Sequence, residues 1–151
     1  AQPPALKQLI DIFQKKQAPV MALTQIDPRE TRKYGIIKAK KSEGRLHEIA
    51  SLVEKPSTEK APSNLAITGK YIITPEIMDA LETAPKGPDG EIRLIAAFQA
   101  VCGTLPLFGY EVEGRRYDTG DKLGFLEATI DFALKRKDIG PALRTYIKNI
   151  S

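Results

Sequence analysis

Along this 151-residue chain, short apolar runs bounded by turn residues alternate with segments whose apolar residues recur at helical spacing and form a stripe. Residues 4–17 carry apolar side chains at helical spacing, whereas residues 19–26 form a continuous apolar run. A stripe marks one buried face of a helix, and a short continuous run marks a buried strand. Because both patterns recur in a chain long enough for one ordinary domain, we predict an α/β domain with a mixed sheet flanked by helices.

The same patterns place the remaining elements. The expected strands cover residues 34–37, 46–53, 65–74 and 108–112, with a hairpin-like connection at residues 42–45. The expected helices begin at or near residues 75, 91, 123 and 141. Strands therefore dominate the middle third of the chain, and helices dominate its end.

Composition excludes several functional classes. The net charge of +4 suits phosphorylated small molecules, whereas nucleic acid usually needs a clustered basic face. No apolar run approaches the roughly 20 residues of a membrane span, and the first residues lack a secretion-signal pattern. Cys102 and His47 are the only cysteine and histidine, too few for a disulfide or a Cys/His zinc site. We therefore expect a cytoplasmic protein that acts on small molecules, without a nucleic-acid or membrane partner.

Glu54 and Lys55 end an expected strand and offer a carboxylate beside a mobile cation. A carboxylate accepts two directional hydrogen bonds, which suits neighbouring sugar hydroxyls, and an ammonium group suits a phosphate. The pair thus matches the two ends of a sugar phosphate. The alternative interpretation is an exposed strand end before Pro56, because glutamate and lysine are common at the surface.

Two further segments are candidates for the same site. Gly35 would let a ligand approach the backbone, although a lone glycine in a strand also marks a bulge. Residues 64–71 hold an amide, a glycine and a phenol, namely Asn64, Gly69 and Tyr71. Asn64 either contacts a ligand or caps the loop, since asparagine favours turns in any case.

The run of residues 116–125 places Asp118 at the end of an expected strand, followed by Gly120 and a helix. Open α/β sheets bind ligands outside the carboxyl ends of their strands, and Mg²⁺ is held by one or two carboxylates plus phosphate oxygens. Gly120 would let the backbone turn sharply or approach a ligand. Alternatively, Asp118, Thr119 and Asp121 simply cap the helix.

Taken in order, these segments resemble the bacterial UTP–glucose-1-phosphate uridylyltransferases. Glu-Lys-Pro at residues 54–56 is shared among sugar-phosphate nucleotidyltransferases, whereas Ala-Pro-Ser-Asn-Leu-Ala at 61–66 and Asp-Lys-Leu-Gly at 121–124 are narrower motifs. The further matching segments are residues 34–36, 69–72, 74–77, 90–92 and 117–120. The resemblance runs from residue 4 to about residue 150 and implies the C-terminal part of a Rossmann-like nucleotide-diphospho-sugar transferase fold.

The resemblance also implies a Mg²⁺-dependent reaction. An oxygen of glucose-1-phosphate would attack the α-phosphorus of UTP and give UDP-glucose and pyrophosphate. Glu54 would hold sugar hydroxyls, Lys55 the sugar phosphate, and Asp118 would be one of two aspartate metal ligands, so Lys55 and Asp118 are the expected catalytic residues. Such a reaction depends mainly on positioning and charge neutralisation. The expected substrate-contacting residues are Gly35, Glu54, Lys55, Asn64, Gly69, Tyr71 and Gly120.

The chain departs from the family in two places. First, it has no glycine-rich nucleotide loop. In the family, the segment before the helix that here begins near Pro4 carries this loop, together with an activating arginine and lysine and the first metal aspartate. Residues 1–151 are therefore expected to be the sugar-phosphate-binding half of a larger enzyme, lacking the nucleotide-binding half and inactive alone. In addition, Ile95 and Ala96 replace a threonine–aspartate pair, which removes two polar groups next to the site.

Two functions remain open from the sequence. The chain is either part of a working uridylyltransferase or a non-catalytic sugar-nucleotide-binding or assembly module. Without the first half, a strand edge and apolar helix faces would be bare, and other chains tend to cover such surfaces. We therefore expect a homo-oligomer.

Overall fold

The computed structural model describes residues 3–87 and 89–150. The chain divides into two compact units, Ala1–Gly114 and Arg115–Ser151, here called the barrel unit and the helical unit. Within the described residues, no helix is both long enough and apolar enough to cross a membrane.

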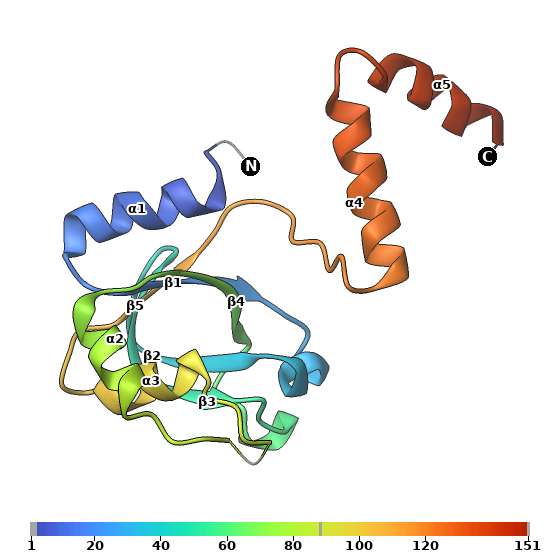
Figure 1. Cartoon of the computed structure of the whole chain (residues 1–151). Helices are drawn as coiled ribbons and strands as arrows, with labels where there is room; N and C mark the ends of the chain where they lie inside the picture. The colour runs from blue at the N-terminus through green and yellow to red at the C-terminus, as the bar shows by residue number, and fades with distance from the viewer. Residues whose placement is uncertain (1–2, 88, 151) are drawn as a thin grey trace. The chain divides into compact units, whose positions relative to one another are not determined.

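The barrel unit is built on one mixed sheet that closes on itself (Figure 1). β1 and β5 are parallel, and the other neighbouring strands are antiparallel. The predicted mixed sheet is confirmed, but it forms a closed barrel where an open sheet was expected. The strands, in sheet order, are β1 (Val20–Gln25), β4 (Leu65–Ile72), β2 (Gly35–Glu43), β3 (Leu46–Glu54) and β5 (Phe108–Glu111).

Closure gives every strand of the barrel a neighbour on both sides. β1 accounts for this, because it pairs with β4 along one edge and with β5 along the other. The sequence-based expectation of a bare strand edge is therefore wrong for the barrel unit. Pairing of β1 with β5 closes the sheet and leaves no edge strand.

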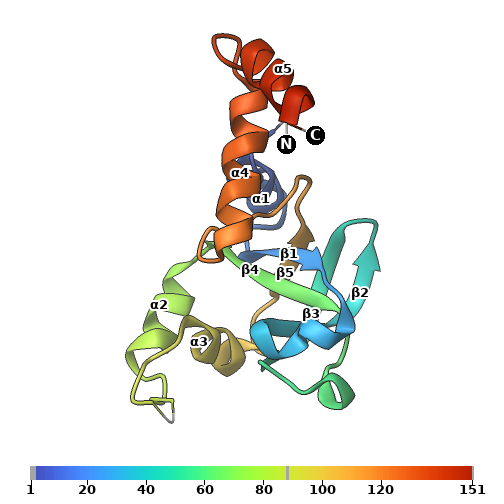
Figure 2. The ribbon, with the colours of Figure 1, turned by 90° about the vertical axis from the view of Figure 1, so that its right-hand side faces the viewer.

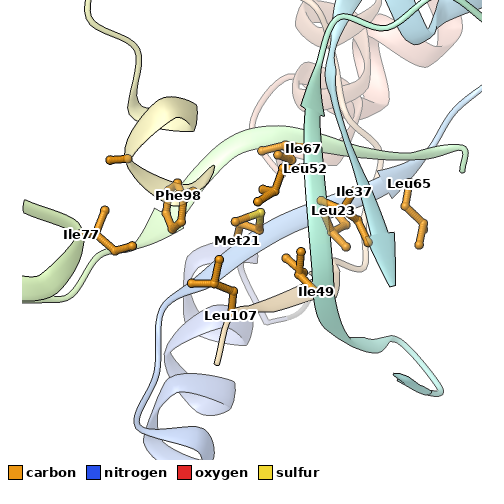
Figure 3. Packing of buried hydrophobic residues seen from close by; sticks show 11 residues of the cluster. Met21, Leu23, Ile37, Ile49, Leu52, Leu65, Ile67, Ile77, Phe98 and Leu107 are labelled. Atoms are coloured by element: carbon orange, nitrogen blue, oxygen red, sulfur yellow. The ribbon is translucent and has the colours of Figure 1, made fainter. Parts of the chain in front are cut away.

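The alternating side chains of β1 join two buried clusters, because successive residues of a strand face opposite sides. Val20 and Ala22 pack with Leu9 of helix α1 (Ala5–Lys16), which confirms the predicted helix over residues 4–17. Met21 and Leu23 instead join the main core (Figure 3). The other residues of that core are Ile37, Ile49, Leu52, Leu65, Ile67, Ile77, Ala97, Phe98 and Leu107.

Two short helices and two 3-10 turns complete the barrel unit. Helix α2 contributes Ile77 and helix α3 contributes Phe98 to the main core (Figure 3). The two helices lie against each other (Figure 2). Their bounds are α2 (Pro75–Glu82) and α3 (Leu94–Val101), and those of the turns are η1 (Pro28–Lys33) and η2 (Thr58–Lys60).

Helix α3 begins at Leu94, three residues later than predicted. The preceding residues are held in a turn, because the Gly87 N–H donates to the Glu91 carbonyl oxygen at 2.8 Å and Lys86 forms a β-bridge with Ile92. These interactions use the backbone groups that an earlier helix start would need.

The helical unit consists of α4 (Lys122–Lys135) and α5 (Gly140–Ile150), which pack against each other. Both helices were predicted. Asp121 caps α4 by accepting a hydrogen bond from the Gly124 N–H at 2.9 Å. Gly124 is required here, because a Cβ at this position would collide with the Asp118 carbonyl oxygen.

The residues before α4 form no strand, so the prediction that Asp118 ends a strand is wrong. Among the residues described, 115–118 have no ladder partner. Side chains hold this segment instead: Arg115 forms ion pairs with Glu127 at 2.6 Å and Asp131 at 3.0 Å, and the Tyr117 hydroxyl donates to Asp131. The extended backbone is therefore tied to α4 and does not extend a sheet.

Candidate functional site

The Glu54–Lys55 pair lies where β3 ends beside the start of β2. Glu54 pairs in the sheet with Gly35, and the Lys55 N–H donates to the Tyr34 carbonyl oxygen at 3.0 Å. Lys55 Nζ is 4.0 Å from Glu54 Oε1, and the side chains are 56% and 30% exposed respectively. A carboxylate and an ammonium group are thus held side by side and remain accessible to a ligand.

Lys55 has a left-handed backbone, with φ of 44°. This conformation costs a residue with a Cβ about 1–2 kcal/mol. The hydrogen bond to Tyr34 fixes it, and it turns the chain immediately after Glu54. Strained positions of this kind cluster at functional sites.

A cleft of about 290 Å³ opens beside Glu54. It brings together four of the predicted substrate-contacting residues, namely Gly35, Glu54, Gly69 and Tyr71. The complete lining comprises Lys33, Tyr34, Gly35, Glu54, Ile67, Gly69, Tyr71, Arg93, Leu94 and Ile95. The cleft is therefore built from strands β2, β3 and β4, the end of η1 and the start of α3.

Tyr71 places a phenol in this cleft. Its ring stacks on Phe98, with 5.6 Å between the ring centroids. Burial raises the pKa of Tyr71, and the negative charge of Glu54 raises it further. The phenol therefore stays protonated at neutral pH and offers a hydrogen-bond donor near the Glu54 carboxylate.

Gly69 lies at an irregularity between β1 and β4. Met21 pairs with Tyr71 whereas Leu23 pairs with Ile67, so three residues of β4 oppose one residue of β1. Gly69 has φ of 68°, and no atom lies within 4 Å of the position that a Cβ would occupy. The register shift leaves open space beside Gly69 in the cleft.

Gly35 faces protein atoms where a Cβ would stand. That point is 2.7 Å from Ile95 Cδ1, 3.2 Å from Ile67 Cδ1 and 3.2 Å from Glu54 Oε2. Only glycine accommodates these neighbours without a shift. The space that a side chain on Gly35 would need is therefore already taken by neighbouring side chains that line the cleft.

Asn64 does not line the cleft. Ser63 performs the local capping instead, because its hydroxyl donates to the Ile37 carbonyl oxygen at 2.7 Å and accepts from the Leu65 N–H at 3.0 Å. Asn64 contributes its backbone carbonyl, which accepts from the Ile26 N–H at 3.1 Å. Its amide is exposed and remains available for another contact.

Sequence reasoning missed Arg93 and Lys33, the cations that line the cleft. Arg93 precedes α3 and forms ion pairs with Asp89 and, at 3.8 Å, with Glu91. The Glu91 N–H and the charge of Arg93 hold the pKa of Asp89 below its usual range. The sequence held a signal for Arg93, because a single basic residue in a mostly apolar expected helix, residues 91–101, is a candidate for binding an anion.

Asp118 and Gly120 belong to the helical unit. Asp118 Oδ1 accepts from the Gly120 N–H at 3.1 Å, and Oδ2 lies 3.2 Å from Arg116 Nη2. Asp121 caps α4, and Asp118 closes the turn before it. The Asp118 side chain is 58% exposed, so its oxygen atoms remain accessible.

Asp118 fits one ligand of Mg²⁺, because exposed carboxylate oxygens are the donors that this ion prefers. In the described part of the chain, no three Asp, Glu, His or Cys side chains cluster so as to hold a metal ion. The remaining ligands would therefore have to be phosphate oxygens, water or groups outside these residues.

Comparison with known proteins supports the resemblance found in the sequence. Residues 2–134 match the nucleotidyl transferase family. The UTP–glucose-1-phosphate uridylyltransferase of Staphylococcus haemolyticus (strain JCSC1435) is 42% identical over 147 residues, which cover 97% of this chain and 51% of that protein. The enzyme of the same name from Bacillus subtilis (strain 168) is 41% identical over 150 residues, covering 99% and 51%. The chain thus spans about half the length of the curated relatives it matches.

Solved structures agree. A UDP-glucose pyrophosphorylase complexed with UDP-glucose aligns with a TM-score of 0.82 and 36% identity, over 89% of this chain and 51% of that one. A UTP-bound enzyme of this kind from Acinetobacter baumannii aligns with a TM-score of 0.83 and 29% identity, over 95% and 50%. The predicted fold and the predicted resemblance are both confirmed.

Proposed function

The chain belongs to the nucleotidyl transferase family, and on this premise we propose that it is the sugar-phosphate-binding part of an enzyme that makes UDP-glucose and pyrophosphate from UTP and glucose-1-phosphate. Because the chain spans half the length of its relatives, we propose that the nucleotide is bound mainly by residues outside it. By itself, the chain is then expected to bind substrate without turnover.

The observation that carries this proposal is the Glu54–Lys55 pair, in which Glu54 lines the cleft and Lys55, outside the lining, holds its ammonium group 4.0 Å from the Glu54 carboxylate. Glu54 accepts hydrogen bonds from sugar hydroxyls, Tyr71 donates one from its phenol, and Lys55 neutralises the phosphate. Glu54 and Tyr71 come from strands of one closed barrel and Lys55 directly follows β3, so the backbone positions of all three are set before a ligand arrives. Such preorganisation reduces the entropy that binding would otherwise cost.

In the proposed reaction, a bond forms between a phosphate oxygen of glucose-1-phosphate and the α-phosphorus of UTP, and the bond to pyrophosphate breaks. The protein residues contribute by orienting the sugar phosphate and by offsetting negative charge. Mg²⁺, held in part by Asp118, would neutralise charge on the phosphates. Gly120 would keep the backbone turn that presents the Asp118 carboxylate.

Two further expectations belong to this proposal. Exposed apolar side chains on α4, among them Leu123, Phe125 and Leu126, support self-association into a homo-oligomer. The single cysteine, Cys102, is a free thiol, which supports a reducing cytoplasmic location. The second candidate function is a non-catalytic sugar-nucleotide-binding module, and it is favoured because no three Asp, Glu, His or Cys side chains of the described residues cluster so as to hold a metal ion.

Titration of the chain with glucose-1-phosphate, followed by calorimetry, tests the proposal. Glu54→Gln should weaken binding about tenfold or more, because hydrogen bonds to a charged acceptor contribute about 1.5–3 kcal/mol. The matched control is Glu48→Gln on the same strand, whose side chain is also 30% exposed and bonds Lys40 at 2.7 Å. Equal binding by wild type and Glu54→Gln, or equal loss in both variants, would contradict the proposed site.

The two candidate functions separate in a second assay. The chain is combined with the separately produced part of a relative that it does not span, and UDP-glucose formation is measured. Magnesium-dependent product would support the enzyme. Binding of glucose-1-phosphate without product in any such combination would favour the non-catalytic module.

A further inference from the structure

The lining of the cleft beside Glu54 combines two kinds of side chain. Lys33, Tyr34, Glu54, Tyr71 and Arg93 are polar or charged, whereas Ile67, Leu94 and Ile95 are aliphatic and are together called the aliphatic wall. A hexose ring carries hydroxyls around its edge, so a wall without donors or acceptors leaves any hydroxyl that faces it without a partner.

Ile95 and Glu54 both approach Gly35, and Ile95 is the aliphatic residue that comes nearest to the Cβ position of this glycine. Ile95 Cδ1 and Glu54 Oε2 lie 2.7 Å and 3.2 Å from one point, the position that a Cβ would take on Gly35. A ring that Glu54 holds by its hydroxyls would therefore also face Ile95. The side chain is half-buried and packs against the main core, which limits its freedom to move away.

We propose that Ile95 is a specificity-determining residue of this site, and that it favours hexose-1-phosphates carrying hydrogen in place of a hydroxyl on the part of the ring that faces it. The inference rests on the proposed function, because it assumes that a sugar phosphate occupies the cleft. It adds to that function a preference within the class of sugar phosphates.

The size of the effect follows from the chemistry of the wall. A hydroxyl that faces Ile95 loses its hydrogen bonds to water and gains none from the protein. Aliphatic pockets reject an added hydroxyl by no more than about 10²-fold, whereas sites built to bond a hydroxyl reject its absence much more strongly. A partly open cleft such as this one should therefore discriminate by roughly tenfold.

The test uses calorimetric titration of the 151-residue chain with glucose-1-phosphate, 4-deoxyglucose-1-phosphate and 6-deoxyglucose-1-phosphate. Wild type should bind at least one deoxy analogue about tenfold more tightly than glucose-1-phosphate. Ile95→Thr should shift the ratio of affinities about tenfold toward glucose-1-phosphate, because the threonine hydroxyl supplies the missing partner. Ile95→Val keeps an aliphatic wall and should leave that ratio unchanged.

The matched control is Ile92→Thr. Ile92 is 50% exposed and faces a separate hollow beside α2, so it should leave the ratio as in wild type. Thermal unfolding of each variant checks that it is folded. If Ile95→Thr does not fold, Ile95→Ala gives the same shift by withdrawing the wall and admitting water.

Two results would overturn the inference, and they are distinguishable. If neither deoxy analogue binds wild type more tightly than glucose-1-phosphate, or if Ile95→Thr (or Ile95→Ala in its place) leaves the ratio unchanged, the inference fails while the proposed function stands. If none of the three sugar phosphates binds wild type, the proposed function and the inference both fail.

Discussion

The barrel unit and the helical unit bury their apolar residues to very different extents. In the barrel unit, residues 20–23 of β1 are all buried, and cores lie on both faces of that strand. In the helical unit, Ala128 is the one buried apolar side chain in the described part. The large apolar residues that it exposes are Leu123, Phe125, Leu126, Ile130, Phe132, Ile139, Tyr146 and Ile150.

This difference shows how firmly each unit holds its own candidate residues. Glu54, Gly69 and Tyr71 are on paired strands around a packed core, so the barrel alone fixes them. Asp118 precedes a helix pair with little core of its own, and short helices depend on tertiary packing for their stability. The proposed sugar-phosphate contacts are therefore preorganised, whereas the position of Asp118, the proposed metal ligand, depends on a helix pair that buries little apolar surface.

Truncation of one apolar side chain in each unit is the strongest test of this contrast. Met21→Ala should cost about 2–5 kcal/mol in the free energy of unfolding, because Met21 is fully buried. Leu126→Ala should change it by about 0.5 kcal/mol or less, because Leu126 is 55% exposed. Urea denaturation measures both. Similar losses in the two variants would mean that the helical unit is covered in solution, and the contrast would fail.

Loss of the Asp118 carboxylate should have a large effect on rate. The test protein joins this chain to the part of a relative that the chain does not span. In this hybrid, Asp118→Ala should lower turnover by at least about 10²-fold, because loss of one preorganised charge-stabilising group has an effect of this size. Asp138→Ala is the control, since Asp138 is exposed and pairs with Arg136 in the same unit. A near-wild-type rate for Asp118→Ala would remove this residue from the metal site.

Much of the fold could be predicted from the sequence, because apolar periodicity reports which side of an element is buried. The helix over residues 4–17, the hairpin near Gly44 and the helix after Asp121 all follow from such local patterns. Closure of the barrel could not be predicted, because the pairing of β1 with β5 joins segments far apart in the chain. Asp118 was misplaced for a related reason: an extended segment becomes a strand only when a neighbour pairs with it.

The site was predicted in part. Glu54, Lys55 and Tyr71 stood out because charged and phenolic groups at strand ends suggest chemistry. Lys33 and Arg93 were missed, since their approach to the cleft depends on the end of η1 and the start of α3. The sequence indicated that Ile95 replaces a polar residue next to the site, but the specificity role that we propose for it could not be predicted, because it depends on the approach of Ile95 to Gly35.

Relief of backbone strain at Lys55 should separate stability from binding. Lys55→Gly should raise the free energy of unfolding by about 1 kcal/mol, because glycine adopts the left-handed region without the Cβ penalty. The same variant should bind glucose-1-phosphate more weakly, since the ammonium group is lost. Lys40→Gly, inside β2, should be destabilising. A lower stability for Lys55→Gly would show that its conformation carries no strain.

The smallest expected effect concerns alkaline pH. Burial and the charge of Glu54 raise the pKa of Tyr71, so the unfolded chain releases this proton at a lower pH than the folded chain does. The stability that it contributes is therefore complete below about pH 10, the ordinary pKa of tyrosine, and falls as pH rises through the higher pKa of the folded state. Tyr71→Phe should lose less stability than wild type between pH 9 and pH 11, whereas the exposed Tyr146→Phe should follow wild type.

We propose that the barrel unit by itself binds a sugar phosphate at the Glu54 cleft. Amide chemical shifts of the ¹⁵N-labelled chain, recorded during titration with glucose-1-phosphate, test it most directly. We predict saturable shifts at Gly35, Glu54, Lys55 and Gly69, with no comparable changes along α4 and α5. Shifts confined to the helical unit, or no saturable shift at the Glu54 end of the barrel, would contradict it.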